Sequence, residues 1–493
     1  MPNQKNYTSI GKKYRYSSST SAPLFLLNSG YKMPNQTHKV AIQALQQLLG
    51  KRLSTGRSIL EIHGRDEAYT NPALPDAVAF PNSTKEVSEI VKICAMHRCP
   101  MVPFGVGTSL EGHVVPTQGG ISIDTSRMNS VLEIRGQDLN VVVQPGVTRS
   151  QLNTELRALG LMFTVDPGAD ATLGGMAATR ASGTNAVRYG TMRENVLALE
   201  VVLPDGQIIH TGSQARKSSA GYDLTHLFVG SEGTLGIITQ LTIRLFGQPE
   251  STRAATCVFE TVNDAVTAVI LAIQSGIPFA RVELLDEIQM RGMNLYNADM
   301  NYPEKPHLFL EFQGTNATTT EQVEMFNTIS DDLGASEYQW ATKTEERNAL
   351  WKARHDAYYA AKTLRPGAEG FVTDCCVPIS KLAECITQTK IEIEKSGLIA
   401  PILGHVVDRN FHLIILIEPG NNIELDAANQ LSEAANLLAL KFGGTVTGEH
   451  GVGLGKKKYM QEEHGAAYDL MGLLKSTIDP DNLMNPDKLV NLS

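Results

Sequence analysis

Two segments rich in glycine and other small residues constrain the fold of this chain more than any other feature. The first spans residues 105–113 and contains three glycines and two hydroxyl residues, and the second spans residues 166–192. Backbone N–H groups in such segments can surround phosphate oxygens, and the absence of bulky side chains lets the backbone approach a flat ligand. Two such segments in one domain predict a site for a nucleotide-containing cofactor.

Short strands and helices surround these segments. Ser83 and Glu86 form a capping-box pattern at the start of a helix. Strand-like runs follow at residues 100–104, 120–124, 131–134 and 141–144, and a further helix begins near Ser150. The elements do not alternate as regular βαβ units, so the expected fold class is α+β. Neither glycine-rich segment has the strand–GxGxxG–helix context that a nicotinamide site of the Rossmann type needs.

The composition excludes several classes of protein. With 493 residues, 42% of them hydrophobic, the chain is long enough for two or three domains. A formal net charge of -9 provides no basic surface for nucleic acid. None of the six cysteines forms a CxxC pair, which argues against a zinc knot or disulfide scaffold and favours a reducing compartment. The apolar run 413–417 is too short to span a bilayer, so any membrane contact is expected to be peripheral.

The N-terminal segment differs in charge from the rest of the chain. The first 60 residues contain nine Lys or Arg residues and no Asp or Glu. The tetrapeptide Met-Pro-Asn-Gln occurs at residues 1–4 and again at 33–36. We expect residues 1–40 to be a leader or disordered extension, with a transit signal, a membrane-surface arm or a translation start at Met33 as alternatives.

A set of metal-ligating residue types lies in the last quarter of the chain. His405 and His412 flank residues 407–410, where Asp and Asn are typical of a tight turn, so both histidines are expected on one hairpin. Glu449 and His450 follow further along the chain. Two imidazoles and a carboxylate suit Zn or Mn equally, and the remaining histidine offers a general base.

Several segments carry a resemblance to a known family. They are residues 103–112, 166–192, 228–239, 404–412, 448–451 and 479–488. In them the chain resembles the FAD-linked 2-hydroxyacid dehydrogenases, which include glycolate oxidase subunits and have a FAD domain of the p-cresol methylhydroxylase (PCMH) or vanillyl-alcohol oxidase type. The resemblance covers residues 41–489, and runs 175–192 and 353–355 are most similar to members that oxidise D-lactate.

The resemblance implies three structural parts after the leader. These are a PCMH-type FAD-binding domain at residues 41–248, an inserted ferredoxin-like substrate or cap domain at 249–440, and a C-terminal helical segment at 441–493 that completes the active site. Residues 249–251, Pro-Glu-Ser, agree with the first boundary because they break regular structure. After them we expect a strand at 254–259, a helix capped by Asn263 or Asp264, and a strand at 308–312.

The resemblance also implies FAD that is bound without a covalent link. His113 leaves covalent attachment as the alternative, because some members of the broader fold use a histidine in this loop. The residues expected to contact FAD are Pro103, Gly105, Gly107, Thr108, Ser109, Gly112, His113, Pro167, Gly168, Thr172, Gly174, Gly175, Ala178, Ser182, Gly183, Asn185, Tyr189, Gly190, Gly233, Ile238 and Asn485.

By the same resemblance, the protein oxidises a D-2-hydroxy acid, with D-lactate to pyruvate as the leading expectation. A cation held by His405, His412 and Glu449 would chelate the substrate and lower the pKa of its hydroxyl group. His450 would accept the hydroxyl proton while hydride passes from Cα to flavin N5. Arg354 would bind the substrate carboxylate through its planar guanidinium group.

The sequence departs from the family pattern near this site. Val407 and Arg409 replace two glycines of the usual Gly-Asp-Gly-Asn turn, and a positive φ would be costly at Val407. Val372 stands where relatives acting on a dicarboxylate have lysine, which favours a substrate with a small or apolar side chain. The alternatives are a glycolate or D-2-hydroxyglutarate dehydrogenase, a flavin oxidase or synthase of the same fold, and a non-enzymatic subunit of a glycolate-oxidising complex.

Partners and location are the least constrained properties. The expected electron acceptor is a quinone, a cytochrome or another flavoprotein, and homodimer formation is open. We expect a location in the cytoplasm or on the inner face of a bacterial membrane, with a mitochondrial location as the alternative.

Overall fold

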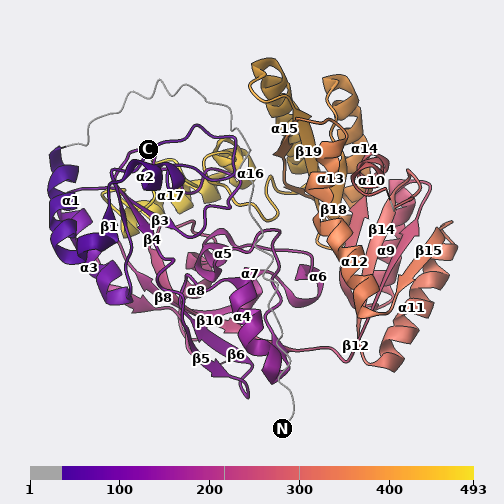
Figure 1. Ribbon diagram of the computed structural model, residues 1–493, viewed down its shortest axis with the longest axis horizontal. Coiled ribbons are helices and arrows are strands. Elements are labelled where there is room, and N and C mark those ends of the chain that lie inside the picture. The colour runs from indigo at the N-terminus through magenta and orange to yellow at the C-terminus, as the bar shows by residue number, and fades with distance from the viewer. Residues whose placement is uncertain (1–35, 216, 299, 493) are drawn as a thin grey trace, which may run out of the picture.

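The computed structural model describes residues 36–215, 217–298 and 300–492. Two halves lie side by side in Figure 1. The left half contains the elements up to β11 (Phe246–Gly247), together with the C-terminal helices α16 (Met460–His464) and α17 (Ala466–Ile478) in yellow. The right half contains β12 (Ser251–Val258) to α15 (Asn422–Lys441). The chain therefore leaves the first half after β11 and returns to it at its C-terminal segment.

Helix α1 (Gln36–Leu49) begins before the predicted start of the folded chain at Ala41. Its buried residues Ala41, Leu45 and Leu49 recur at the spacing of one helical face. Of the leader or extension predicted for residues 1–40, residues 36–40 belong to this helix, and residues 1–35 lie outside the described residues.

Two sheets form the core of the first half. The smaller has the order β1-β2-β4-β3, with β2, β4 and β3 parallel and β1 antiparallel. The larger is antiparallel, in the order β5-β6-β10-β8-β9, and β7 pairs separately with β11. The strands are β1 (Leu53–Ser54), β2 (Ala77–Ala79), β3 (Met101–Phe104), β4 (Ile121–Asp124), β5 (Val131–Arg135), β6 (Asn140–Val143), β7 (Leu161–Met162), β8 (Val196–Val202), β9 (Ile208–His210) and β10 (Ile237–Arg244).

The strands predicted between residues 100 and 144 are confirmed as β3 to β6, with ends shifted by one residue at most. Ser83 caps α3 (Thr84–Met96), because its Oγ accepts the Glu86 N–H at 3.3 Å. The Glu86 carboxylate does not complete the capping box but accepts the Asn82 N–H at 2.8 Å and pairs with Arg52. The other short helices are α2 (Arg57–Ile62), α4 (Arg149–Leu156), α5 (Leu173–Thr179), α6 (Ala186–Tyr189), α7 (Met192–Asn195), α8 (Leu224–Phe228), η1 (Gly50–Arg52), η2 (Arg157–Leu159) and η3 (Lys457–Tyr459).

An antiparallel sheet of eight strands organises the second half. Its order is β15-β12-β14-β13-β18-β19-β16, and β17 also pairs with β19. The elements that complete this half are β13 (Phe279–Leu285), β14 (His307–Gly314), β15 (Ser336–Ala341), β16 (Glu369–Val372), β17 (Cys375–Cys376), β18 (Ile402–His405), β19 (Asn410–Ile417), α9 (Val262–Gln274), α10 (Glu287–Tyr296), α11 (Asn316–Asp331), α12 (Thr344–His355), α13 (Ala357–Thr363) and α14 (Ile379–Ser396).

The first four of these strands have the predicted ferredoxin-like arrangement. Strands β12, β13, β14 and β15 follow the chain order β-α-β-β-α-β with α9 and α11, apart from the added helix α10, and lie in the spatial order 4-1-3-2. The predicted fold class is therefore confirmed. The predicted cap of α9 was wrong, because the side chain of Thr261, not of Asn263 or Asp264, accepts the N–H that caps the helix.

Different helices bury the two faces of the large sheet. On β19, Leu413 and Ile415 belong to a core shared with α9, α11, α14 and α15. Ile414 and Leu416 belong to a core shared with α10, α12 and α13. Because side chains alternate along a strand, His412 shares the face of Ile414, toward α12 and α13.

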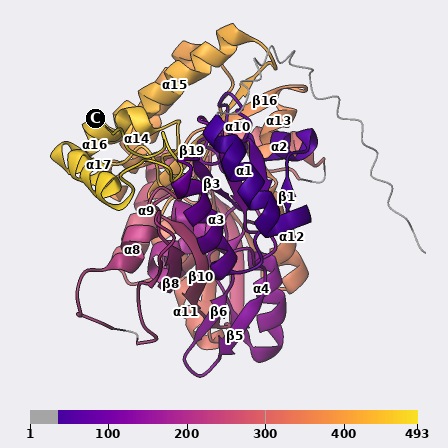
Figure 2. The same cartoon turned by 90° about the vertical axis from the view of Figure 1, so that its left-hand side faces the viewer.

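The C-terminal segment docks onto the small sheet of the first half. Met101 N donates to Leu483 O at 2.7 Å, and Asn485 N donates to Met101 O at 2.7 Å. Lys475 on α17 is 2% exposed, donates at 2.8 Å to the carbonyl oxygens of Thr234 and Met484, and forms an ion pair with Asp479. Figure 2, which looks onto the left side of Figure 1, shows α1 and α3 in front and α16 and α17 beside them.

Two expectations from composition can be compared with the described residues. Within them, no helix combines the length and apolar character needed to cross a bilayer. The six cysteines all lie in the described ranges as free thiols, five of them buried.

Replacing Lys475 with Met should destabilise the protein by about 3–5 kcal/mol, because it leaves the Asp479 carboxylate buried without its cation. Thermal unfolding followed by circular dichroism measures the effect. Lys85→Met, on the exposed surface of α3, is the matched control and should change stability by about 0.5 kcal/mol or less. Equal midpoints for the two variants would show that Lys475 does not anchor α17.

Candidate active site

A cavity of about 860 Å³ lies where three parts of the chain meet. The glycine-rich segments of the first half form one wall, and residues of β16, β18 and β19 with α12 and α13 form another. Residues 449–459 of the C-terminal segment and polar residues of α15 close the remaining side. Its size and mixed lining are typical of a cofactor or substrate site.

Most of the predicted cofactor-contacting residues line this cavity. They are Pro103, Gly105, Gly107, Thr108, Ser109, His113, Pro167, Gly168, Thr172, Gly174, Gly175, Ala178, Ser182, Gly183, Gly233, Ile238 and Asn485. Gly112, Asn185, Tyr189 and Gly190 are not among its lining residues.

Two of these four residues form hydrogen bonds between the two halves. Asn185 holds the two halves together, since its Oδ1 accepts from Arg281 Nε at 2.8 Å. The Tyr189 hydroxyl donates to Gln313 Oε1 at 2.6 Å and likewise joins the first half to β14. Gly112 lies in a bend and Gly190 is the C-cap of α6, both with φ values of 77°, which glycine adopts without strain.

The cavity wall has two properties that suit a large cofactor rich in heteroatoms. Close backbone approaches require glycine: a Cβ on Gly105 would lie 2.4 Å from Thr172 Oγ1, and one on Gly233 would lie 2.8 Å from Pro103 Cγ. Thr172 Oγ1 and His113 Nδ1 are buried and lack hydrogen-bond partners, whereas His113 Nε2 faces Glu232 Oε1 at 3.3 Å. Because unpaired buried polar atoms are costly, these groups fit a bound ligand that supplies donors and acceptors.

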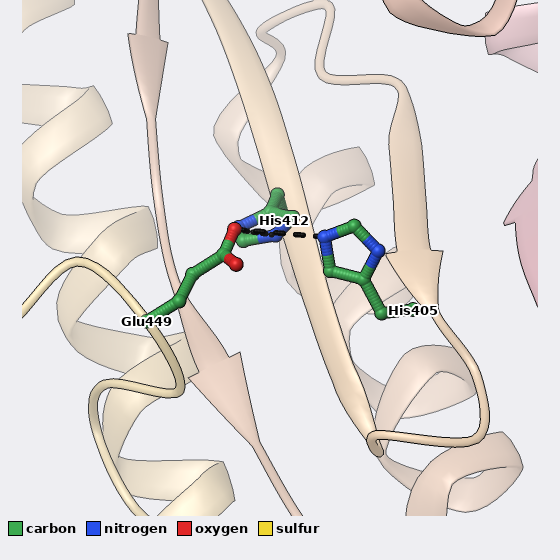
Figure 3. A group of neighbouring side chains, drawn as sticks. All are labelled: His405, His412 and Glu449. Carbon is green, nitrogen blue, oxygen red and sulfur yellow. Dashed lines mark ion pairs between the residues drawn. The ribbon is translucent and has the colours of Figure 1, made fainter. Parts of the chain in front are cut away.

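The three predicted metal ligands converge beside this wall (Figure 3). Glu449 Oε1 lies 3.5 Å from His405 Nε2 and 3.3 Å from His412 Nε2. One ligand atom from each residue falls within 4.8 Å of the others. Both histidines are buried, at 8% and 5% exposure. This separation leaves room for one divalent cation bonded to two nitrogens and an oxygen.

Hydrogen bonds to the outer ring nitrogens fix how both histidines point. His412 Nδ1 lies 2.9 Å from Thr373 O, and His405 Nδ1 lies 2.6 Å from Glu283 Oε1. A carbonyl oxygen can only accept, so His412 Nδ1 carries hydrogen, and in the neutral ring Nε2 keeps a lone pair. The second nitrogen of a metal-ligating histidine usually has such a partner. Both rings therefore present Nε2 to the space beside Glu449.

The predicted hairpin carries these ligands, although its turn differs in detail from the expectation. Strands β18 and β19 pair with His405 opposite Asn410 and Leu403 opposite His412, so the two histidines are diagonal neighbours. Arg409 takes a left-handed φ of 68°, whereas Val407 is absent from the residues with positive φ. The backbone strain that results from the missing glycines of the family pattern is therefore at Arg409 and not at the β-branched Val407.

A fully buried carboxylate, Asp374, holds the loop that contains Glu449 and His450. Its Oδ2 accepts the N–H of Glu449 at 3.0 Å and the N–H of His450 at 2.9 Å, as well as the Thr447 hydroxyl at 2.7 Å. Burial alone would raise the pKa of Asp374, but His450, His412 and Lys456 lower it well below its usual value. Asp374 is therefore ionised and keeps the loop in one conformation.

The two glycines of the Gly448–Gly451 stretch permit this close packing. A Cβ on Gly448 would lie 1.8 Å from Asn410 Nδ2, and one on Gly451 would lie 2.7 Å from His113 Nε2. The following N–H groups of Val452 and Gly453 donate to the Glu232 carboxylate at 2.7 and 2.9 Å. The loop is thus packed against the metal hairpin on one side and the glycine-rich wall on the other.

His450, the predicted general base, lies next to the proposed metal ligands. Its ring stacks on that of His412, with centroids 5.3 Å apart and an interplanar angle of 12°. Its Nδ1 is 3.8 Å from Glu111 Oε1 and has no hydrogen-bond partner. Burial lowers the pKa of His450, but Asp374, Glu111 and Glu449 outweigh that effect and raise it above its usual value.

Arg354 lines the cavity, as predicted for a carboxylate-binding group, but part of its guanidinium is already bonded. Its Nε and Nη2 donate to Glu283 Oε2 at 2.9 and 2.5 Å. Burial would raise the pKa of Glu283, but His405 and Arg354 together hold it below its usual value. Arg354 Nη1 does not donate to Glu283, so it is the nitrogen that would donate to an incoming substrate carboxylate.

The sequence reading missed the two carboxylates that support these groups. Glu283 is a single acid within the apolar strand Phe279–Leu285, and an unexpected charge in a buried strand was the available signal. Asp374 follows Val372 and Thr373 without any local pattern that marks it. Only the tertiary structure brings both beside residues of the 405–412 and 447–450 segments.

Comparison with known proteins places the chain in a family. The model described as FAD binding domain matches residues 75–212, and the model described as FAD linked oxidases, C-terminal domain, matches residues 248–489. The probable mitochondrial D-lactate dehydrogenase of Danio rerio is 50% identical, over 90% of this chain and 89% of its own. The mitochondrial D-lactate dehydrogenase (cytochrome) of Arabidopsis thaliana is 44% identical, over 92% and 81%. The glycolate oxidase subunit GlcD of Bacillus subtilis is 35% identical, over 87% and 92%.

Solved structures with low sequence identity share the fold. A substrate-bound p-cresol methylhydroxylase superposes with a TM-score of 0.75 at 19% identity, covering 92% of this chain and 97% of its own. An alkyldihydroxyacetonephosphate synthase gives a TM-score of 0.74 at 19% identity, covering 93% and 86%. The predicted PCMH-type fold is confirmed by these neighbours. The chain belongs to the family of FAD-linked oxidases that includes the D-lactate dehydrogenases named above.

Proposed function

We propose that this protein oxidises a D-2-hydroxy acid, above all D-lactate, to the 2-oxo acid with FAD as electron acceptor. The observation that carries the proposal is that one cavity joins the glycine-rich wall to the group formed by His405, His412, Glu449 and His450. Relatives named as D-lactate dehydrogenases, at 50% and 44% identity over most of the chain, support the substrate. When bound, FAD supplies a two-electron acceptor beside the substrate Cα.

The apolar residues near the hairpin support a substrate with a small side chain. Val372 lies opposite Ile414 on neighbouring strands, and Ile414 shares one face of β19 with His412. Phe371 stacks on Tyr69 with ring centroids 5.2 Å apart, and both residues line the cavity. Val372 offers no positive charge to a second carboxylate, which disfavours D-2-hydroxyglutarate. Glycolate, the substrate named for the Bacillus subtilis relative, is the second candidate.

Each polar group has a proposed role in holding the substrate. A divalent cation, Zn or Mn, bound by His405, His412 and Glu449 would polarise the substrate hydroxyl group. Arg354 Nη1 would bind the carboxylate, and the ring of His450 would accept the hydroxyl proton. Asp374 keeps this ring in place through the backbone N–H of His450.

The flavin is proposed to be held without a covalent link. His113, the candidate for attachment, faces the Glu232 carboxylate at 3.3 Å and is 3% exposed. An ion pair with Glu232 gives this histidine a structural role at the wall of the cavity. A cytochrome as electron acceptor and a mitochondrial location are proposed from the names of the Arabidopsis thaliana and Saccharomyces cerevisiae relatives.

Mixing the FAD-loaded protein anaerobically with D-lactate should bleach the flavin absorbance, with glycolate slower and L-lactate slowest. The expected order follows from the fixed positions of Arg354 and the hairpin, which admit one arrangement of carboxylate, hydroxyl and Cα–H. Stopped-flow absorbance measures the rate for each acid. A flavin that stays oxidised with D-lactate, D-2-hydroxybutyrate and glycolate alike would rule out the proposed function.

Changing His450 to Ala should slow flavin reduction by D-lactate by about 10²–10⁴-fold, because the hydroxyl proton loses its acceptor. FAD content should stay at the level of the unaltered protein, since the backbone N–H that binds Asp374 remains. His210→Ala, an exposed histidine on β9, is the control and should reduce its flavin normally. Release of FAD by His450→Ala would instead assign the residue a structural role.

Removing the divalent cation should abolish flavin reduction reversibly. We expect dialysis against a chelator to inactivate the protein and addition of either Mn or Zn to restore it, because both metals suit two imidazoles and a carboxylate. The variant Glu449→Ala should contain no bound cation after the same treatment, as measured by mass spectrometry of the metal content. Full activity of the metal-free protein would remove the cation from the mechanism.

A further inference from the structure

Glu283 divides its two carboxylate oxygens between the two groups proposed to hold the substrate. Oε1 lies 2.6 Å from His405 Nδ1, and Oε2 accepts from Arg354 Nε and Nη2 at 2.9 and 2.5 Å. The residue is 0% exposed, and its partners are 8% and 7% exposed. A single buried carboxylate therefore touches a proposed metal ligand and the proposed carboxylate-binding group at the same time.

The backbone makes this arrangement rigid. Glu283 on β13 lies directly opposite His405 on β18 in the antiparallel register, so their side chains share one face of the sheet. Arg354 comes from the last turn of α12, which packs on that face. Two paired strands and a helix thus hold the three residues. A shift of one side chain would therefore move the other two.

Charge balance also favours all three groups together. Glu283 is fully buried, and a buried carboxylate without a cation costs several kcal/mol. Arg354 supplies that cation through Nε and Nη2. The contact between Glu283 Oε1 and His405 Nδ1 leaves the other ring nitrogen, Nε2, on the side of Glu449.

We propose that Glu283 is a positioning residue that couples metal binding to substrate-carboxylate binding. It holds the ring of His405 with Nε2 toward Glu449 and holds Arg354 with Nη1 toward the cavity, which fixes the distance between the hydroxyl-binding and carboxylate-binding groups. The substrate class selected by this spacing is an acid whose hydroxyl and carboxylate are on adjacent carbons. This inference rests on the proposed function for its substrate part, whereas its metal part does not depend on the substrate.

Glu283→Gln gives the sharpest test, because an amide has one acceptor oxygen for two donors. If that oxygen accepts from Arg354, the amide NH₂ group faces the N–H of His405. In the reverse orientation, the NH₂ group faces the guanidinium group of Arg354. We expect binding of Mn(II) alone, measured by loss of the free-ion electron paramagnetic resonance signal, to weaken by about 10–100-fold. The KM for D-lactate should also rise, with FAD content unchanged.

The double variant Glu283→Gln with Arg354→Met separates coupling from general damage. Without the guanidinium, the amide oxygen is free to accept from His405 Nδ1, so Mn(II) affinity should recover relative to Glu283→Gln while D-lactate binding stays weak. Glu311→Gln is the matched control, since Glu311 is a buried carboxylate on the neighbouring strand β14 with Gln313 and Arg281 as partners. It should bind Mn(II) and D-lactate as the unaltered protein does.

The outcomes separate this proposal from the proposed function. Normal Mn(II) affinity and a normal KM in Glu283→Gln, or no recovery of Mn(II) affinity in the double variant, would overturn the coupling role. A failure of D-lactate to reduce the flavin of the unaltered protein would overturn the proposed function. The Mn(II) titrations need no substrate, so they would still test the role of Glu283 in metal binding. If Glu283→Gln loses FAD, Glu283→Asp replaces it: the shorter side chain keeps the charge but cannot reach both partners, and unchanged Mn(II) affinity and KM there would overturn the proposal.

Discussion

The buried carboxylate of Asp374 is the constraint on which the arrangement of the site depends. It accepts the N–H groups of Glu449 and His450 and also Asn410 Nδ2, at distances of 2.9 to 3.0 Å. Lys456 donates to the Asp374 carbonyl at 2.9 Å. An ionised carboxylate that is fully buried needs its N–H donors, because losing them costs several kcal/mol. The loop therefore stays where its carboxylate and imidazole meet the hairpin.

Local sequence patterns were sufficient for much of the fold and for the residue types of the site. The strands β3 to β6, the cap at Ser83 and the hairpin with His405 and His412 could be predicted because hydrophobic alternation, capping and turn residues act over a few neighbours. The Gly448–Gly451 stretch was recognised through the resemblance to the family. Its glycines proved to be required by packing against Asn410 and His113, which no local pattern contains.

The parts that could not be predicted depend on contacts between distant segments. Glu283 and His405 are 122 residues apart, and Asp374 and His450 are 76 apart, so their pairing follows only from the register of the large sheet and the return of the chain. Asn185 and Tyr189 were assigned to the cofactor because small and polar residues surround them in sequence. The structure uses both to join the two halves, since their side chains reach Arg281 and Gln313.

The hydrogen bonds of Asn485 join residues that are synthesised early to a residue that is synthesised late. Asn485 Nδ2 donates to the carbonyl oxygens of His113 at 3.0 Å and Glu232 at 2.7 Å, across 372 and 253 residues. A nascent chain on the ribosome exposes the glycine-rich segments long before the loop around His450 has been made, and contacts of such separation form slowly. A partly synthesised chain can thus display the cofactor wall without any group able to oxidise a substrate beside it.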